Sequence, residues 1–336
     1  MNILKNDWPC VALARAPLAD RTTLRVGGYA EWLLEPTTPD ELVDAVVAAR
    51  AFVEEAVARR GPAAGALRIL GGGANLVIGD GELPGVVVST ERLRRIFRPT
   101  TPAAAEGDLL SEAQADPRMA QGPVEEDPRL VVWCGATLPK LARTARDLGL
   151  SGLEGIVGVP GHVGGGVAMN AGGRWGDMWD VVESIRVIEP DGTPRDLARD
   201  ECSPTYRNAN LGERVVVGAV LRFTPDHKAA VSDRMSDYLR EKRRVQPVTE
   251  WSAGCVFKNP DPELSSGRSA GRLVDECGGK SLSRGDAIVS PLHGNFIVNQ
   301  GQATAVDVLT LMEDVQDLVA QKTGVRLEFE VKRWTA

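Results

Sequence analysis

The chain contains 336 residues, of which 43% are apolar and 25% are charged, a composition typical of a globular protein with two or three domains. The net charge of −7, from 39 basic and 46 acidic residues, argues against non-specific nucleic-acid binding, which requires a basic surface. We therefore expect no nucleic-acid partner, although an anionic small molecule needs only a local cluster of arginine or lysine.

The cysteines and the chain's apolar segments indicate a cellular compartment. Five widely spaced cysteines without a CxxC pair favour reduced thiols over a disulfide framework or a zinc site, and three histidines argue against a His-rich metal centre. The N-terminal ten residues lack the apolar core of a signal peptide, and no apolar run approaches the roughly 18 residues of a membrane span. We expect a cytoplasmic protein with no metal and no membrane association.

Helix and strand patterns alternate in the first third of the chain. The segment Thr38–Glu41 predicts a capping box with proline at the first helical position, followed by an apolar helical stripe over residues 42–47. Short apolar runs at 67–70 and 86–88 predict strands. Together these patterns favour an α/β unit.

Residues 98–128 interrupt this pattern with prolines, acidic residues and alanines that show no periodicity, which predicts a mobile, solvated insertion. A strand at 130–133 and a helix at 138–148 follow it. Strands are predicted at 184–189 and 215–223, divided by a turn at Asp191-Gly192.

A linker at 225–227 marks the predicted main domain boundary. Helices are expected at 231–244 and 304–319. A regular alternation of apolar and charged residues predicts a final strand over 325–331. The predicted domains are an N-terminal extension at 1–20, a larger domain at 21–225 and a smaller one at 226–336.

Two glycine-rich segments carry the strongest chemical signals. In residues 71–76, directly after a predicted strand, three glycines let backbone N–H groups converge on an anion such as a phosphate or pyrophosphate. The loop matches neither the Walker A nor the Rossmann pattern. On its own, a three-glycine turn is structural more often than functional.

The second segment, residues 155–173, contains too many separated glycines and a proline for a stable helix or a central strand. Such backbone must be held by something packed closely against it, and a large flat cofactor with a pyrophosphate would suffice. The alternative is a glycine-rich turn without a ligand.

Six segments now stand in a specific order along the chain: 23–28, 70–76, 158–172, 206–207, 254–260 and 327–331. Together they resemble the MurB family of UDP-N-acetylenolpyruvoylglucosamine reductases over about residues 20–333. The resemblance implies an α+β fold, in which a two-lobed PCMH-type FAD-binding region precedes a smaller α/β substrate-binding domain.

The resemblance also implies an activity. NADPH reduces FAD, and the flavin then reduces the enolpyruvyl ether of UDP-N-acetylglucosamine to UDP-N-acetylmuramate in peptidoglycan precursor synthesis. The only implied partner is this small-molecule substrate, and we expect a monomer or a weak oligomer.

Binding residues are carried over from the family position by position. For FAD they are Arg25, Gly71, Gly72, Gly73, Ala74, Asn75, Leu76, Gly158, Val159, Pro160, Gly161, Gly164, Gly165 and Asn170. For the substrate they are Tyr206, Arg243, Gln246, Lys258, Asn259 and Asn295.

Three residues are implied to be catalytic. Hydride addition builds negative charge on the substrate carboxylate, which Arg207 and Glu330 would stabilise, and Cys255 would protonate the enolate carbon. From the residue types alone, Arg207 is interpreted as a member of a surface ion pair and Cys255 as a small buried apolar residue. Periodicity does not separate Glu330 from Glu328.

The chain departs from the family pattern at two positions. Cys255 stands where serine is usual, and a thiol titrating near pH 8.5 is neutral at pH 7 yet able to donate a proton. His162 stands where threonine is common, so a flavin contact there is open. Arg207 and Cys255 lie 48 residues apart, which fits the shorter form of the family with a more open substrate site.

Two other readings remain. Another PCMH-type flavoprotein, such as an alcohol or lactate oxidase, would share the glycine segments but would not need the segments at 254–260 and 327–331 together. A non-catalytic flavin- or UDP-sugar-binding protein would explain the missing serine but not the retention of Arg207 and Glu330.

Overall fold

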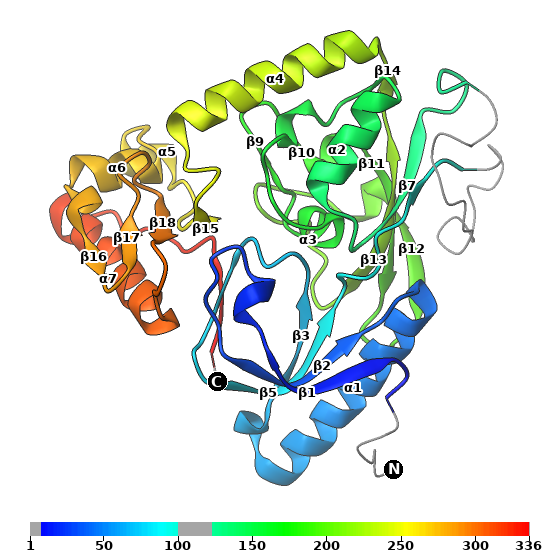
Figure 1. The fold of residues 1–336 in the computed structure, drawn as a ribbon, viewed down its shortest axis with the longest axis horizontal. Helices are drawn as coiled ribbons and strands as arrows, with labels where there is room; N and C mark the ends of the chain where they lie inside the picture. Colours follow the sequence, from blue (N-terminus) through cyan, green and yellow to red (C-terminus); the bar gives the residue numbers. More distant parts are fainter. Residues whose placement is uncertain (1–7, 100–122, 336) are drawn as a thin grey trace. The chain divides into compact units, whose positions relative to one another are not determined.

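The computed structural model describes residues 8–99 and 123–335 (Figure 1). Most of the predicted insertion at 98–128 therefore lies outside the described residues. The chain divides into two compact units. Unit 1 comprises Met1–Leu13, Leu33–Gly72 and Gly85–Arg240, and unit 2 comprises Ala14–Trp32, Gly73–Pro84 and Glu241–Ala336.

A four-stranded sheet has the order β1-β2-β5-β3, formed by β1 (Val11–Pro17), β2 (Tyr29–Glu35), β5 (Glu82–Ser89) and β3 (Ala66–Leu70). Strands β3 and β5 confirm two predicted strands and pair in parallel, but β4 and not a helix lies between them along the chain, so this pair is not the predicted βαβ unit. Residues 11–17 form a strand of this sheet, although they lie in the predicted N-terminal extension.

Helix α1 (Pro39–Arg60) packs against β3. Only one of the two hydrogen bonds of the predicted capping box forms at its N-terminus. The Thr38 hydroxyl accepts from the Glu41 N–H at 3.2 Å, but the Glu41 carboxylate bonds the backbone and hydroxyl of Thr37 instead of the Thr38 N–H. Gly61 ends the helix with a φ of 85°.

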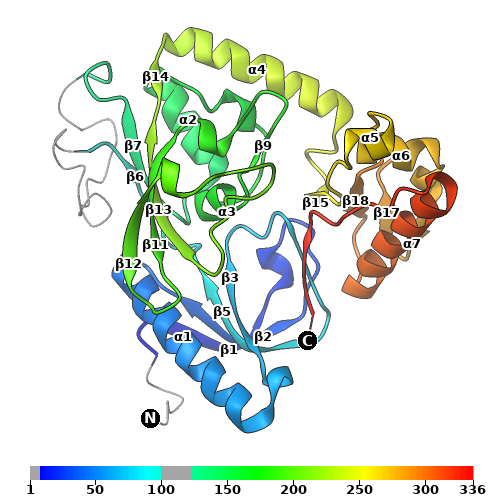
Figure 2. The ribbon, with the colours of Figure 1, turned by 180° about the vertical axis from the view of Figure 1, so that it is seen from behind.

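Unit 1 contains a five-stranded antiparallel sheet with the order β12-β11-β13-β7-β6 (Figure 2). Its strands are β6 (Ile96–Phe97), β7 (Arg129–Trp133), β11 (Val182–Ile188), β12 (Pro194–Ala198) and β13 (Val215–Arg222). The predicted strands at 130–133, 184–189 and 215–223 are confirmed. The hairpin partner β12 was missed.

Helix α2 (Leu138–Asp147) confirms the helix predicted at 138–148, whereas α3 (Val163–Ala168) lies where the glycines argued against any helix. Helix α3 packs against β13 and β7, so tertiary packing outweighs the poor helix propensity of its glycines. Two short pairs complete unit 1: β9 (Gly172–Gly173) with β10 (Gly176–Asp177), and β8 (Leu150–Ser151) with β14 (Thr224–Pro225).

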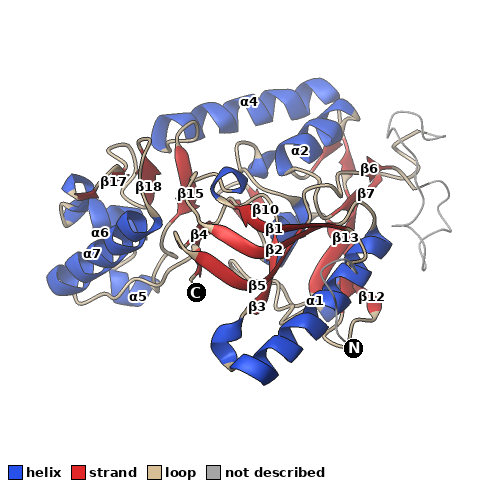
Figure 3. Cartoon of the chain, turned by 60° about the horizontal axis from the view of Figure 1, so that its bottom comes forward, coloured by secondary structure: helices blue, strands red, loops and turns tan. Residues whose placement is uncertain are grey.

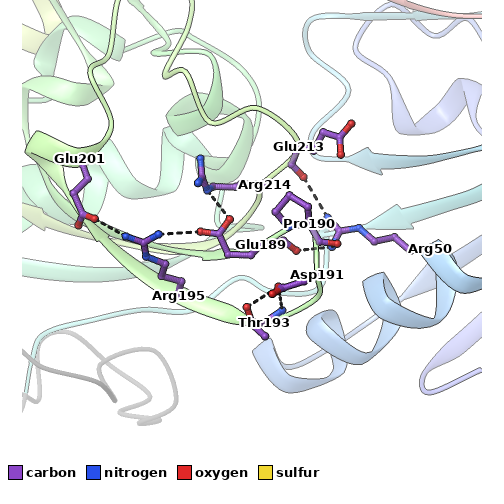
Figure 4. A network of polar contacts seen from close by, with 9 residues as sticks. All are labelled: Arg50, Glu189, Pro190, Asp191, Thr193, Arg195, Glu201, Glu213 and Arg214. Carbon is purple, nitrogen blue, oxygen red and sulfur yellow. Dashed lines mark hydrogen bonds and ion pairs between the residues drawn. The ribbon is translucent and has the colours of Figure 1, made fainter.

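A polar network joins α1 to the five-stranded sheet within unit 1 (Figure 4). The Arg50 guanidinium donates to the carbonyl oxygens of Glu189, Pro190 and Glu213 at 2.5, 2.9 and 3.3 Å. The Glu189 carboxylate in turn accepts from Arg214 at 2.8 Å. One side chain of α1 thereby fixes two loops of the neighbouring sheet.

Helix α4 (Lys228–Val245) follows the predicted linker, and the division between the units falls within it, after Arg240. Unit 2 contains an antiparallel sheet with the order β15-β18-β17-β16, in which α7 packs against β16 and β17 (Figure 3). Its elements are β15 (Trp251–Cys255), α5 (Pro262–Ser265), α6 (Ala270–Glu276), β16 (Ser283–Arg284), β17 (Ala287–Val289), β18 (Phe296–Asn299) and α7 (Ala305–Thr323).

The predicted final strand at 325–331 is wrong as a regular strand. Val325, Leu327 and Val331 are buried as the alternation requires, but the only ladder contact in this stretch is an isolated bridge between Phe329 and Phe257. Regular pairing begins at β19 (Lys332–Trp334), which pairs in parallel with β4 (Leu76–Ile78) of the same unit.

Candidate functional site

The two glycine segments meet within unit 1. Gly71 and Gly72 follow β3, and a Cβ added to Gly72 would lie 2.8 Å from the Cα of Gly161 and 3.0 Å from the Cδ2 of His162. A Cβ on Gly71 would lie 3.8 Å from the Cβ of His162. Position 72 therefore requires glycine because two stretches of backbone pass too closely for a side chain.

The second segment turns at 158–161 and then starts α3. Gly158 and Gly161 have φ angles of 78° and 112°, a backbone region that favours glycine. The Gly164 N–H donates to the Cys134 carbonyl at 2.8 Å, which holds the turn against β7. A Cβ on Gly165 would have no atom within 4 Å, so this face of the segment is open.

His162 lies where the two segments meet. It is 9% exposed, and its Nδ1 is enclosed without a hydrogen-bond partner among the described residues. Burial lowers the pKa of the imidazole, an effect that Glu91 opposes and Arg94 reinforces. The ring is therefore neutral at pH 7.

Asn170 is buried and has a φ of 45°. Its Nδ2 donates to the Thr205 carbonyl at 3.1 Å, and its Oδ1 accepts from the Trp179 N–H at 3.2 Å. The side chain thus connects the end of the glycine segment to the loop that carries Tyr206 and Arg207.

Arg207 is held by the hairpin of β9 and β10. Its Nη2 donates to the Gly172 carbonyl at 3.0 Å, and its Nη1 lies 3.9 Å from Oδ1 of Asp177. The side chain is 16% exposed, and its guanidinium lies 4.9 Å from the ring centre of the exposed Tyr206. A φ of 57° at Arg207 places it among the uncommon left-handed non-glycine residues.

Asp177, which is not among the predicted site residues, lies beside Arg207. Burial raises the pKa of its carboxyl, and the Arg207 charge opposes that shift. A Cβ on Gly172 would lie 1.9 Å from Oδ1 of Asp177, so the glycine leaves room for the carboxylate. Only the glycine density of this stretch could have pointed to a close approach here.

Cys255 ends β15 in unit 2 and is half-buried. The pairing of β15 with β18 shifts register between Ser252 and Cys255, and Gly254 takes a φ of 79°, so the strand bulges beside the thiol. The next residue, Val256, accepts a hydrogen bond from the Glu330 N–H at 2.8 Å. Two of the three predicted catalytic residues are therefore brought onto adjacent backbone.

The second half of the first glycine loop also lies in unit 2. Asn75 donates from Nδ2 to the Glu330 carbonyl at 3.1 Å, and its own carbonyl accepts from the Lys332 N–H at 3.0 Å. A Cβ on Gly73 would lie 2.2 Å from the Arg21 carbonyl oxygen. Ala74 and Leu76 flank Asn75, and Leu76 opens β4.

Two predicted substrate residues bond the protein's own backbone. Asn295 is 3% exposed, and its amide both donates to and accepts from the backbone of Phe257, at 2.8 and 2.9 Å. The Asn259 Oδ1 accepts from the Ala270 N–H at 3.1 Å, at the start of α6. These contacts give both amides a role in holding the segment that carries Cys255 and Lys258.

Lys258 borders a pocket of about 350 Å³ within unit 2. Its Nζ lies 3.4 Å from a Glu328 carboxylate oxygen, so Glu328, the neighbour that periodicity could not separate from Glu330, serves as its counterion. The pocket is lined by Lys258, Asn259, Pro260, Asp261, Leu264, Thr323, Gly324, Val325, Arg326 and Glu328.

The remaining predicted residues lie elsewhere in unit 2. Arg25, with a φ of 59°, forms an ion pair with Asp20 at 2.5 Å. Arg243 is exposed in the last turn of α4, and Gln246 follows that helix.

Within residues 8–99 and 123–335, none of the helices combines the length and the apolar character that a membrane span needs. No group of three or more histidine, cysteine or acidic side chains in those ranges is placed to hold a metal ion.

Comparisons with known proteins cover nearly the whole chain. Residues 246–334 match the family model for the C-terminal domain of UDP-N-acetylenolpyruvoylglucosamine reductase, and residues 118–198 match an FAD-binding domain. The reductase of that name from Deinococcus radiodurans is 39% identical over 326 residues, covering 95% of each chain, and that from Moorella thermoacetica is 36% identical, covering 96% of this chain and 93% of its own.

A solved structure agrees with these relatives. The crystal structure of UDP-N-acetylenolpyruvylglucosamine reductase from Thermus caldophilus matches with a TM-score of 0.71 and 34% identity, covering 97% of this chain and 98% of its own. The predicted α+β fold, with an FAD-binding region and a C-terminal domain, is confirmed. The chain belongs to the UDP-N-acetylenolpyruvoylglucosamine reductase family, the MurB flavoenzymes.

Proposed function

We propose that this protein is a cytoplasmic, FAD-dependent UDP-N-acetylmuramate dehydrogenase. It takes a hydride from NADPH and reduces the enolpyruvyl ether of UDP-N-acetylglucosamine in peptidoglycan precursor synthesis, and so supports cell shape and division. We assign FAD binding to residues 21–225 and substrate binding to 226–336, in a monomer or weak oligomer. The observation that carries the proposal is the family membership over 95% of the chain.

The residues present fit FAD. The backbone of Gly72 and Gly161 approaches too closely for side chains, and the enclosed Nδ1 of His162 has no partner among the described residues. Exposed backbone N–H groups at such glycines bind phosphate oxygens. When bound, FAD supplies the hydride-transfer chemistry that no side chain can provide.

The chain's own residues would control charge and proton transfer. Hydride adds to the terminal carbon of the substrate double bond, and electron density moves onto the carboxylate. Arg207, a permanent cation with a planar fork, and Glu330 would stabilise this charge. The Cys255 Sγ–H would then give its proton to the carbon that bears the carboxylate, which completes the reduction.

Anaerobic stopped-flow absorbance tests the proposal. Addition of NADPH should bleach the flavin band, and addition of the enolpyruvyl substrate should restore it with formation of UDP-N-acetylmuramate. Bleaching without recovery would contradict the proposed substrate. A failure of NADPH to bleach the band, with bleaching by a hydroxylated substrate, would favour an oxidase.

A further inference from the structure

One buried polar group in unit 1 has no assigned role. The Nδ1 of His162 is enclosed and lacks a hydrogen-bond partner among the described residues, whereas buried polar atoms in proteins are nearly always paired. This ring nitrogen therefore calls for a partner that residues 8–99 and 123–335 do not supply.

The position of the ring indicates where that partner binds. The Cδ2 edge of His162 lies against Gly72, its Cβ lies beside Gly71, and its backbone follows Gly161. These three glycines bring their backbone together around the imidazole, so an anion bound by their N–H groups lies within reach of the ring. A half-turn about the Cβ–Cγ bond exchanges Nδ1 with Cδ2 and brings the orphaned nitrogen to the edge that faces the loop.

The imidazole ring of His162 is neutral and can therefore act as an uncharged hydrogen-bond donor. Burial lowers the imidazole pKa, and the nearby charges of Glu91 and Arg94, which pair with each other at 2.6 Å, oppose and reinforce this shift respectively. A neutral imidazole carries one N–H, which can donate a single hydrogen bond to a phosphate oxygen.

We propose that His162 is a cofactor-binding residue whose ring N–H donates a hydrogen bond to a pyrophosphate oxygen of FAD held by Gly71, Gly72 and Gly161. The inference rests on the FAD dependence of the family and not on the proposed roles of Arg207, Cys255 or Glu330. It assigns to an imidazole the contact that the sequence left open at this position.

The test compares His162→Phe, which keeps a ring but removes the donor, with His162→Thr, which restores a hydroxyl donor. Titration of the deflavinated full-length protein with FAD should show that His162→Phe raises the dissociation constant roughly 10- to 100-fold and that His162→Thr recovers most of the loss. His227→Phe, the same change at the exposed start of α4 in the same unit, should leave affinity unchanged.

Two further readouts do not depend on activity. In the ³¹P NMR spectrum of the holoprotein, the FAD pyrophosphate resonances should move in His162→Phe and stay nearly in place in His162→Thr. The flavin reduction potential should be the same in all variants. Unchanged FAD affinity and ³¹P shifts in His162→Phe would overturn the proposal, as would a shifted potential with unmoved phosphorus resonances, because the ring would then act on the isoalloxazine.

Discussion

The glycine segments of unit 1 and the Cys255 segment of unit 2 are built in opposite ways. In unit 1, the proposed binding surface is the backbone itself, and a Cβ added to Gly72 would lie 2.8 Å from the Cα of Gly161. In unit 2, one thiol carries the proposed chemistry, and the buried amide of Asn295 holds the segment that follows it. Mutation should therefore be harmful in unit 1 when it adds atoms and in unit 2 when it removes them.

Removal of the Cys255 thiol should have the largest effect. In Cys255→Ala, NADPH should still reduce the bound flavin at the wild-type rate, because hydride acceptance needs no proton from the thiol. Turnover with the enolpyruvyl substrate should fall roughly 10²- to 10⁴-fold.

Stopped-flow measurement of each half-reaction separates the two steps, and Cys255→Ser should recover most of the lost turnover. Cys10→Ala serves as the control at another half-buried cysteine. Wild-type turnover in Cys255→Ala would show that another group is the acid.

In unit 1, addition of a methyl group to a glycine should destabilise the protein. In Gly72→Ala, the new Cβ would lie 2.8 Å from backbone, so we expect a loss of about 3 kcal/mol in the free energy of unfolding. Gly165→Ala is the matched control because no atom lies within 4 Å of its new Cβ.

Urea unfolding of both proteins gives the free energies, and FAD titration completes the experiment. Gly165→Ala should keep its stability yet bind FAD more weakly if the open face receives the cofactor. Equal stability of the two variants would show that the backbone at Gly72 can move apart at little cost.

Loss of a supporting amide should cost less. Asn295→Leu leaves the N–H and carbonyl of Phe257 without partners in a buried site, which should lower the free energy of unfolding by about 2 kcal/mol. Turnover should fall while flavin reduction by NADPH persists, since only the segment of unit 2 is disturbed. Gln321→Ala, at an exposed amide of α7, should change neither quantity. A higher KM with an unchanged free energy of unfolding would instead indicate that Asn295 contacts the substrate directly.

The smallest effect concerns a carboxylate that supports α4. Burial opposes ionisation of Glu154, but bonds from the Gly152 N–H and from Arg234 outweigh it and hold the pKa of Glu154 below its ordinary value of 4.5. Its stabilisation is complete above pH 4.5 and disappears as the pH falls through the lowered folded-state pKa. Near pH 7, the free energy of unfolding of the wild type should exceed that of Glu154→Gln by about 1 kcal/mol. This difference should shrink below pH 4.5. A difference that does not change with pH would contradict this assignment.

Local signals explain what could be predicted. A threonine cap and a regular apolar stripe specify α7 and α2, so both helices were expected from sequence. The alternation at 325–331 was real, but it reflects burial beside Phe257 and not a sheet. Helix α3 depends on its packing against β13 and β7, which no local pattern records.

In the candidate site too, local features could be predicted from the sequence, whereas contacts between distant residues could not. Glycines that permit close approach are visible in the sequence, although their partners are not. The choice between Glu330 and Glu328 was beyond periodicity and rested on family resemblance. In the structure the two differ through contacts with distant residues, since Glu330 is bound by Asn75 and Val256 and Glu328 pairs with Lys258.

The pairing of β4 with β19 bears on how the protein is made. Lys332 pairs with Leu76, which a ribosome adds 256 residues earlier, and three separate stretches of chain contribute to unit 2. Residues 73–84 therefore leave the ribosome long before their partners exist, while much of unit 1 can already form. A contact between segments so distant in sequence forms late and slowly. Synthesis from the N-terminus would then complete unit 2 last.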